Sequence, residues 1–217
     1  GIIGGLYSST ATISVLARKS RKASELEATD YVAAMLLAVS MMFLRFMILI
    51  LIFSREIFLS IYPYLLTMAV VAAIVAWFIH SRQKRPEDQP AETEEDDSSN
   101  PLEFKVALIF AVLFVIFTFL THYTLVYAGT GGLNLLSFVS GFSDITPFIL
   151  NLLQNTGSVA ALIITACSMQ AIISNIMVNM FYALFFAGKG SKLRPWILGG
   201  FGVVITCNLV LLLFFYI

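Results

Sequence analysis

Charged residues are scarce in this chain, and their scarcity limits the fold that it can adopt. Only 12% of the 217 residues are Asp, Glu, Lys or Arg, whereas 59% are hydrophobic, and the mean hydropathy is +0.90. Between Lys105 and Lys189 the only charged residue is Asp144. Soluble domains carry about 25% charged residues. The composition therefore argues against an ordinary soluble domain and predicts an integral membrane protein.

Residues that bind transition metals or form disulfides are equally few. The chain has two cysteines and two histidines, and both cysteines lie in apolar stretches, where a thiol behaves as a small hydrophobic group. We expect no disulfide and no transition-metal site. The sequence also lacks a phosphate-binding loop, an HExxH motif, a nucleophile elbow and paired carboxylates within its apolar segments. We therefore expect no enzyme and no cofactor. The formal net charge of zero reflects charges that are segregated into short connecting stretches and argues nothing about nucleic acid, and we expect no nucleic-acid partner.

What the chain has instead is long apolar segments. Each is long enough to cross about 30 Å of hydrocarbon at about 1.5 Å per residue, and each carries at most one charged residue. The predicted spans are Tyr31–Phe53, Ile57–Ile79, Phe104–Tyr127, Ser158–Ala187 and Trp196–Ile217.

A low-complexity segment at residues 81–100 separates two halves of the chain. It contains basic residues followed by acidic ones, with two interspersed prolines. Such a segment buries too little apolar surface to offset its ordering entropy, so we expect a charged, disordered linker. The predicted organisation is a first half at residues 1–80, this linker, and a second half at residues 101–217.

Basic residues near the ends of the spans predict the orientation of the chain. They cluster at residues 18–22, 82–85 and 189–194, and the positive-inside rule assigns all three clusters to the cytoplasm. Residues 133–154 then cannot cross the membrane. We expect two short helices there, Leu133–Val139 and Pro147–Gln154, which enter and leave on one side around a break in the sequence SGFSDIT. The alternative is a single kinked crossing.

The two halves also show weak internal similarity. Residues 5–12 (GLYSSTAT) align with residues 141–148 (GFSDITPF), and residues 40–45 (SMMFLR) align with residues 174–179 (SNIMVN). Because the aligned spans run in opposite directions, we predict an inverted repeat, an architecture common among transporters. The predicted fold is an all-α integral membrane protein of two inverted repeats, with about five transmembrane helices and two broken or re-entrant segments.

Polar residues gather at the two breaks and on the spans that follow them. A carboxylate such as Asp144 costs at least about 2.5 kcal/mol in the bilayer core unless it is paired or hydrated. Asp144 is either a cation or proton ligand, an N-cap, or the partner of Arg45, and the hydroxyl groups near Ser9 either line a site or cap a helix. The candidate ion- or solute-binding residues are Gly5, Ser8, Ser9, Thr10, Thr12, Arg45, Ser143, Asp144, Thr146, Asn175 and Asn179. If the solute is a metal cation, Asp144 is its expected ligand.

Five stretches together resemble a known family: GGLYSSTATISVLARKSRKA, MMFLRFMILI, NPLEFKVALIFAVLF, GFSDITPFILNL and SNIMVNMFYALFFAGK. They are similar, in collinear order, to the C-terminal membrane domain of unknown function of MgtC/SapB-type bacterial membrane proteins. The resemblance implies a multi-pass protein of the bacterial inner membrane, with MgtC-like helices upstream of Gly1. Thr146 and Asn179 stand where that family tends to have an aspartate and a lysine.

These features predict a membrane transport protein, either a channel or a secondary transporter for an ion or small solute. Its site would lie between the two broken-helix motifs. Its expected partners are the lipid bilayer, the solute and, in a homo-oligomer, further copies of itself. The alternative is a regulatory or scaffolding membrane subunit whose polar breaks serve helix packing. A water-accessible cavity that reaches Asp144 would favour transport.

Overall fold

The protein is all-helical in the part that the structure describes. The computed structural model describes residues 9–21, 25–82, 102–155, 157, 159–188 and 191–216. Its helices are α2 (Ser9–Lys19), α3 (Glu25–Phe53), α4 (Arg55–Ser81), α5 (Leu102–Ser140), α6 (Ile145–Gln154), α7 (Ala161–Ala187) and α8 (Arg194–Tyr216). The predicted linker lies outside the described residues except for its first two positions, as do the candidate site residues Gly5 and Ser8.

Within the described residues, five helices are long and apolar enough to cross a membrane. Their apolar spans are Thr29–Phe53, Arg55–Ser81, Ala111–Gly129, Ala161–Ala187 and Arg194–Phe214. Each of the five spans predicted from the sequence therefore coincides with a helix suitable for a membrane span, with ends that differ by at most seven residues. The chain is a multi-pass membrane protein.

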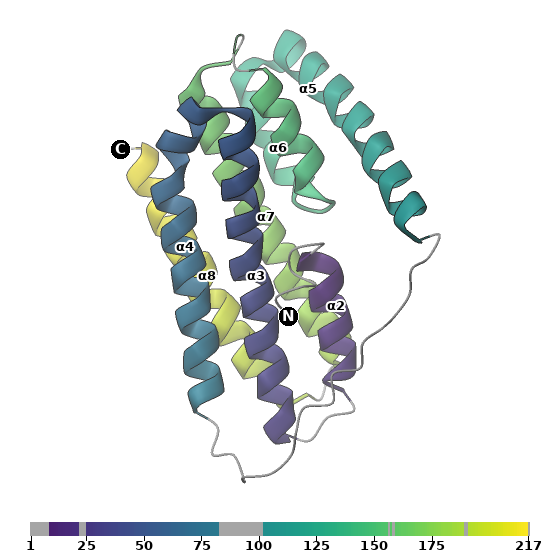
Figure 1. Ribbon diagram of the computed structural model, residues 1–217, viewed down its shortest axis with the longest axis vertical. Helices are drawn as coiled ribbons and strands as arrows, with labels where there is room; N and C mark the ends of the chain where they lie inside the picture. Colours follow the sequence, from purple (N-terminus) through teal and green to yellow (C-terminus); the bar gives the residue numbers. More distant parts are fainter. Residues whose placement is uncertain are drawn as a thin grey trace.

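The long helices differ in how far they are enclosed by the rest of the protein. About 72% of the most apolar stretch of α7 is buried, against 11% for that of α5. Figure 1 shows the first half of α5 standing apart at the edge of the bundle, while α3, α4, α7 and α8 pack side by side. The centre of the molecule is therefore α7, and this helix carries two of the candidate residues, Asn175 and Asn179.

Polar groups also join the long helices. The Ser40 hydroxyl donates to the Ala69 carbonyl at 2.8 Å, and the Tyr64 hydroxyl donates to the Asn208 side-chain oxygen. Lipid is as apolar as a leucine side chain, so membrane helices are held together by close packing and hydrogen bonds of this kind. These bonds tie α3 to α4 and α4 to α8.

A hairpin of short helices follows the first half of α5. Gly129 has φ +59° and ψ −148°, a conformation that side chains disfavour, and the helix changes direction there. The second half, Gly131–Ser140, leads to α6 through a non-helical break at residues 141–144. Figure 1 shows this break near mid-height of the bundle, with the far end of α6 back at the end of the bundle where α3 joins α4. The two short helices expected from the sequence are present, although the first is continuous with the predicted span before it except at Gly129.

Candidate functional site

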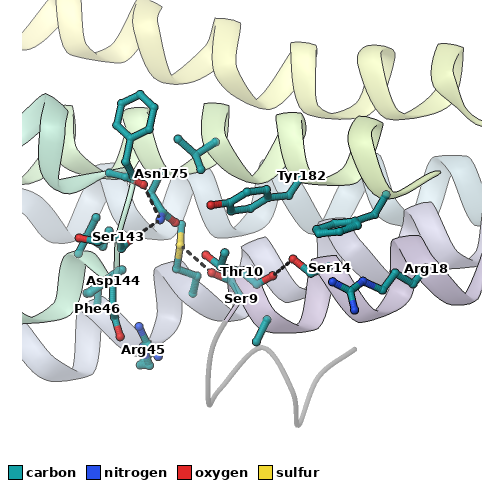
Figure 2. A pocket seen from close by; sticks show the side chains of 17 residues that line it. Ser9, Thr10, Ser14, Arg18, Arg45, Phe46, Ser143, Asp144, Asn175 and Tyr182 are labelled. Carbon is teal, nitrogen blue, oxygen red and sulfur yellow. Dashed lines mark hydrogen bonds between the residues drawn. The ribbon is translucent and has the colours of Figure 1, made fainter. Parts of the chain in front are cut away.

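A cavity of about 500 Å³ lies where α2, α3, the break before α6 and α7 meet. Figure 2 shows its side chains in a row, from Asn175 and Asp144 at one end, past Ser14 and Tyr182, to Arg18 at the other. The lining residues are Ser9, Thr10, Ala11, Ser14, Arg18, Met42, Arg45, Phe46, Gly141, Phe142, Ser143, Asp144, Ile145, Asn175, Val178, Tyr182 and Phe186.

The break itself is built by local hydrogen bonds. The backbone N–H groups of Gly141, Phe142 and Ser143 each donate three residues back, to carbonyls of the last turn of α5, at 3.1–3.3 Å. Asp144 then adopts an extended backbone, with φ −75° and ψ 117°, and its side chain accepts a hydrogen bond from the Thr146 N–H at 2.9 Å. Asp144 is thus the N-cap of α6, one of the alternatives that its position suggested.

Arg45 and Asp144 are linked through a threonine hydroxyl. The Arg45 Nη2 donates to Thr146 Oγ1 at 2.9 Å, and that hydroxyl donates to Asp144 Oδ1 at 2.7 Å. Thr146 itself is buried, while Asp144 is exposed on the cavity wall. The sequence left open whether this carboxylate is paired, hydrated or bound to a solute. The structure places it at an exposed position on the wall of a polar cavity, and hydration at such a position lowers the cost of its charge.

The α7 side of the cavity holds the break in place. Asn175 Nδ2 donates to the carbonyls of Gly141 at 3.2 Å and Ser143 at 3.4 Å, and Asn179 Nδ2 donates to Asn175 Oδ1 at 3.1 Å. The Ser174 hydroxyl donates to the Phe138 carbonyl at 2.6 Å. These bonds require the backbone at Gly141 to lie against α7. A Cβ at this position would come within 2.7 Å of the backbone nitrogen of Asn175.

The α2 side contributes hydroxyl groups and a second cation. Ser9 Oγ donates to Met42 Sδ at 3.4 Å, and Ser14 Oγ donates to the Thr10 carbonyl at 2.8 Å. The guanidinium carbon of Arg18 lies 4.4 Å from the centre of the Phe186 ring. Arg18 is exposed, so its charge stands at the outer end of the row of lining residues.

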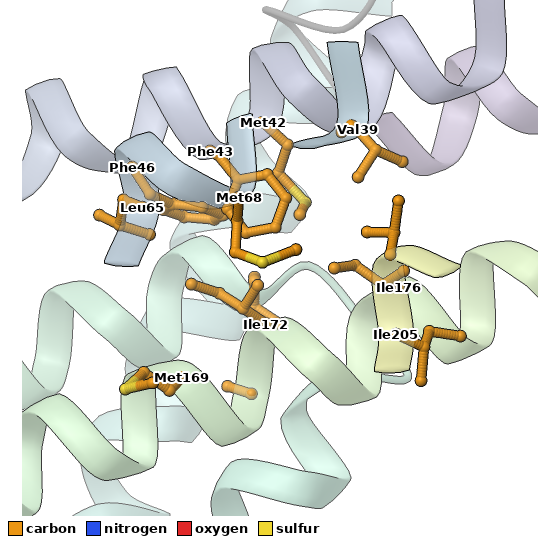
Figure 3. Close-up of a cluster of buried hydrophobic side chains, with 14 of the residues drawn as sticks. Val39, Met42, Phe43, Phe46, Leu65, Met68, Met169, Ile172, Ile176 and Ile205 are labelled. Carbon is orange, nitrogen blue, oxygen red and sulfur yellow. The ribbon is translucent and has the colours of Figure 1, made fainter. Parts of the chain in front are cut away.

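One wall of the cavity is continuous with the apolar core. Met42 and Phe46 line the cavity and belong to a buried cluster that also includes Met68 of α4 and Ile172 of α7. Figure 3 shows these side chains packed between the helices. The cavity therefore lies against a closely packed body.

The structure gathers most of the residues singled out from the sequence. Of the candidates, Ser9, Thr10, Arg45, Ser143, Asp144 and Asn175 line the cavity. Thr146 and Asn179 do not line the cavity but form hydrogen bonds with residues that do, Arg45 and Asn175 respectively. Thr12 lies on α2 outside the lining, and Gly5 and Ser8 lie outside the described residues.

Ser14, Arg18 and Tyr182 were missed by the sequence prediction. Ser14 and Arg18 follow Thr10 at intervals of four residues on α2, so all three share one face of that helix. Tyr182 follows Asn175 by two helical turns on α7. Extending each candidate along its helix face would have found them.

Nothing in the described part of the chain resembles a metal centre. Within it no group of three or more His, Cys, Asp or Glu side chains gathers. The sole exposed carboxylate on the cavity wall is that of Asp144.

Comparisons with known proteins give a family without a function. The pattern of a family described as "Domain of unknown function (DUF4010)" matches residues 1–187. A protein of Aquifex aeolicus (strain VF5), described as "Uncharacterized protein", is 25% identical over 216 residues, which cover 97% of this chain and 91% of the relative. No solved structure matches this chain.

Proposed function

Because the chain belongs to the family of the Domain of unknown function (DUF4010), its function rests on the site alone, and we propose that it is a membrane transport protein. It moves an ion or small solute through the cavity between two broken-helix motifs, and it is not an enzyme. One observation carries this proposal: Arg45 and Asp144 meet at a cavity of about 500 Å³ in a protein made of membrane spans.

The cost of charge in a membrane supports this proposal. Ionisable side chains within membrane spans are rare and usually mark solute pathways, where water or a partner stabilises their charge. The volume of the cavity lies within the range of about 300–1,000 Å³ that is typical of small-molecule sites. Its hydroxyl, amide and guanidinium groups suit a polar solute.

The arrangement of the short helices supports an inverted repeat. Both α2 and α6 begin at the cavity, near mid-height of the bundle, and Figure 1 shows them running to opposite ends. We interpret α2, α3 and α4 as one repeat and α6, α7 and α8 as the other, with residues 131–154 as a re-entrant hairpin. Discontinuous helices that meet near the midplane are the usual solute sites of inverted-repeat transporters.

The location, orientation and partners of the protein are part of the same proposal. We propose that the protein lies in the bacterial inner membrane, with the basic ends of α2, α4 and α8 in the cytoplasm. We also propose, from the resemblance of its sequence to MgtC/SapB-type proteins, that MgtC-like helices are partners of this domain. A homo-oligomer is compatible with the exposed apolar face of α5.

A scaffolding role is the second candidate, and a specific observation favours it. The Asp144 carboxylate caps α6, and Thr146 links it to Arg45, so these polar groups also have a structural use. In a scaffold, the cavity would be a space between helices that binds no solute.

Filling the cavity separates the two functions. We expect the purified protein in liposomes to carry at least one member of a panel of inorganic ions, small carboxylates and amino acids. Ser14→Phe places a ring in the cavity and should abolish that flux, whereas Val15→Phe, at an exposed neighbouring position, should not. Melting temperatures in detergent control for misfolding. A protein that carries no panel member above empty liposomes, or equal flux in both variants, would refute the proposal.

A further inference from the structure

The charges that line the cavity are unequal. Two guanidinium groups, those of Arg18 and Arg45, face it together with a single carboxylate, that of Asp144. Among the described lining residues the formal charge is therefore positive. A cavity with low-dielectric walls amplifies such an imbalance, because field lines are focused along it.

The one carboxylate is already used within the protein. Asp144 Oδ1 accepts hydrogen bonds from the Thr146 N–H and the Thr146 hydroxyl. Its negative charge also stands at the positive end of the α6 dipole. These interactions offset part of the field that Asp144 directs into the cavity.

Backbone oxygens at the break are likewise engaged. The carbonyls of Ser140 and Gly141 accept from Ser143 Oγ and Asn175 Nδ2, and that of Phe138 accepts from Ser174 Oγ. A bound metal cation needs several oxygen ligands that replace its hydration shell. Here each of these carbonyls already accepts a hydrogen bond from a side chain of α7 or of the break, which makes it a weaker ligand for a cation.

Groups that attract negative charge are distributed along the whole cavity. Arg45 lies at the same end as Asp144, and the first turn of α2, which is the positive end of that helix dipole, also lines the cavity. Arg18 lies at the other end, and the Tyr182 side chain, which carries a hydroxyl group, lies between them. Guanidinium groups bind carboxylate and phosphate oxygens through paired hydrogen bonds, which suits an oxyanion better than a metal ion.

We propose that the cavity binds a small oxyanion, a carboxylate or a phosphate group, which the positive charges of Arg18 and Arg45 attract. The inference rests on the cavity of the proposed function and names the class of its solute. The same chemistry is offered by a soluble anion and by the phosphate of an anionic lipid headgroup, and the two sources can be separated by experiment.

The binding test measures melting temperature in detergent, at constant ionic strength, for two series of salts. One series pairs sodium with gluconate, chloride, acetate or phosphate, and the other pairs chloride with sodium, potassium or magnesium. We expect acetate or phosphate to raise the melting temperature by about 5 °C at concentrations far above Kd, and the cation to have no effect.

Two variants assign the effect to the cavity. Arg18→Gln should weaken the anion response at least about tenfold in concentration, since a charge-assisted hydrogen bond is lost. Lys19→Gln removes the same charge one residue further along α2, at an exposed position outside the cavity lining, and should leave the response intact. Phosphate also stabilises proteins in general, and this general effect is the same in both variants, so the difference between their melting-temperature shifts reports the cavity alone.

A lipid arm identifies the source of the oxyanion. Lipid micelles containing phosphatidylglycerol or phosphatidylcholine are added in place of the salts. A shift with phosphatidylglycerol alone that is lost in Arg18→Gln supports the site and assigns it to a lipid headgroup. Responses that follow the cation, or that are equal in the wild type and both variants, overturn the inference.

Flux in liposomes then distinguishes the two proposals. If anions bind but nothing is transported, the oxyanion site stands and the transport function fails. If a cation is transported and anions neither bind nor move, transport stands and the oxyanion inference fails.

Discussion

Asp144 has two separable roles, because its carboxylate caps α6 while its charge faces the cavity. Asp144→Ala removes the cap, and we expect it to lower the free energy of unfolding by about 1 kcal/mol. Asp144→Asn keeps an oxygen that can accept from Thr146 and should cost much less. Chemical denaturation in detergent measures both. A loss as large for Asn as for Ala would show that the charge, and not the cap, stabilises this residue.

Asp144→Asn also tests the sign of the net charge that lines the cavity. Asp144→Asn removes its one exposed carboxylate, so under the oxyanion proposal it should strengthen the anion response. A weakened response would indicate that Asp144 is itself a ligand, as in the cation alternative.

Buried hydroxyl groups on α7 differ in what they contribute to stability. The Ser168 hydroxyl is fully buried and has no hydrogen-bond partner among the described residues, whereas Ser174 donates to Phe138. We expect Ser168→Ala to leave the protein equally stable or more stable, and Ser174→Ala to lower stability by about 1 kcal/mol. Melting temperatures of the two variants provide the test. Equal losses would mean that Ser168 has a partner in the membrane-embedded protein.

At the scale of the helices, the contact between the break and α7 depends on one glycine. A Cβ at Gly141 would overlap the Ser174 side chain and come within 2.7 Å of the backbone nitrogen of Asn175. Since neither backbone can yield easily, Gly141→Ala should separate the break from α7 and destabilise the protein by about 1–3 kcal/mol. It should also impair solute binding, because Asn175 would lose its bonds to the break.

Gly199→Ala is the matched control for that substitution. Gly199 lies in α8 with nothing within 4 Å of the added Cβ, and alanine favours a helix over glycine by up to about 1 kcal/mol. Its melting temperature should be unchanged or higher. A Gly141→Ala protein as stable as this control would show that the break is not held against α7.

For the whole molecule, the basic ends of several helices lie at one end of the bundle. Arg21 donates to the Phe185 carbonyl at 3.2 Å, which brings the end of α2 to the end of α7, and His80 pairs with Asp30 at 2.7 Å, which brings the end of α4 to the start of α3. Figure 1 shows the start of α8 at this same end. The positive-inside rule therefore predicts one cytoplasmic face.

Cysteine labelling in intact cells tests this orientation. In a background with Cys167→Ala and Cys207→Ala, an impermeant maleimide should modify Gly157→Cys, which lies beyond the end of α6. Arg82→Cys, at the end of α4, should react only after the cells are permeabilised. Labelling of Arg82→Cys from outside would invert the orientation and refute the assignment of the basic ends to the cytoplasm.

The spans, the break and its neighbours were accessible from the sequence because the physics there is local. An apolar segment of about 20 residues with few charges favours a membrane helix, since a helix satisfies the backbone hydrogen bonds within the segment itself. A glycine and a proline on either side of Asp144 interrupt such a helix for equally local reasons. Composition and spacing therefore determined the membrane class and where the chain is interrupted.

Only the tertiary structure decided which polar groups face one another. The sequence left Asp144 with three uses, and the fold made it an N-cap joined to Arg45 through Thr146. It also brought Arg18, which the sequence marked only as part of a basic helix end, to the same cavity. Such contacts depend on the rotation of each helix about its axis, which is set by packing between helices far apart in the chain. An apolar helix can face lipid or protein on any side, so its sequence alone does not predict which side faces the neighbouring helices.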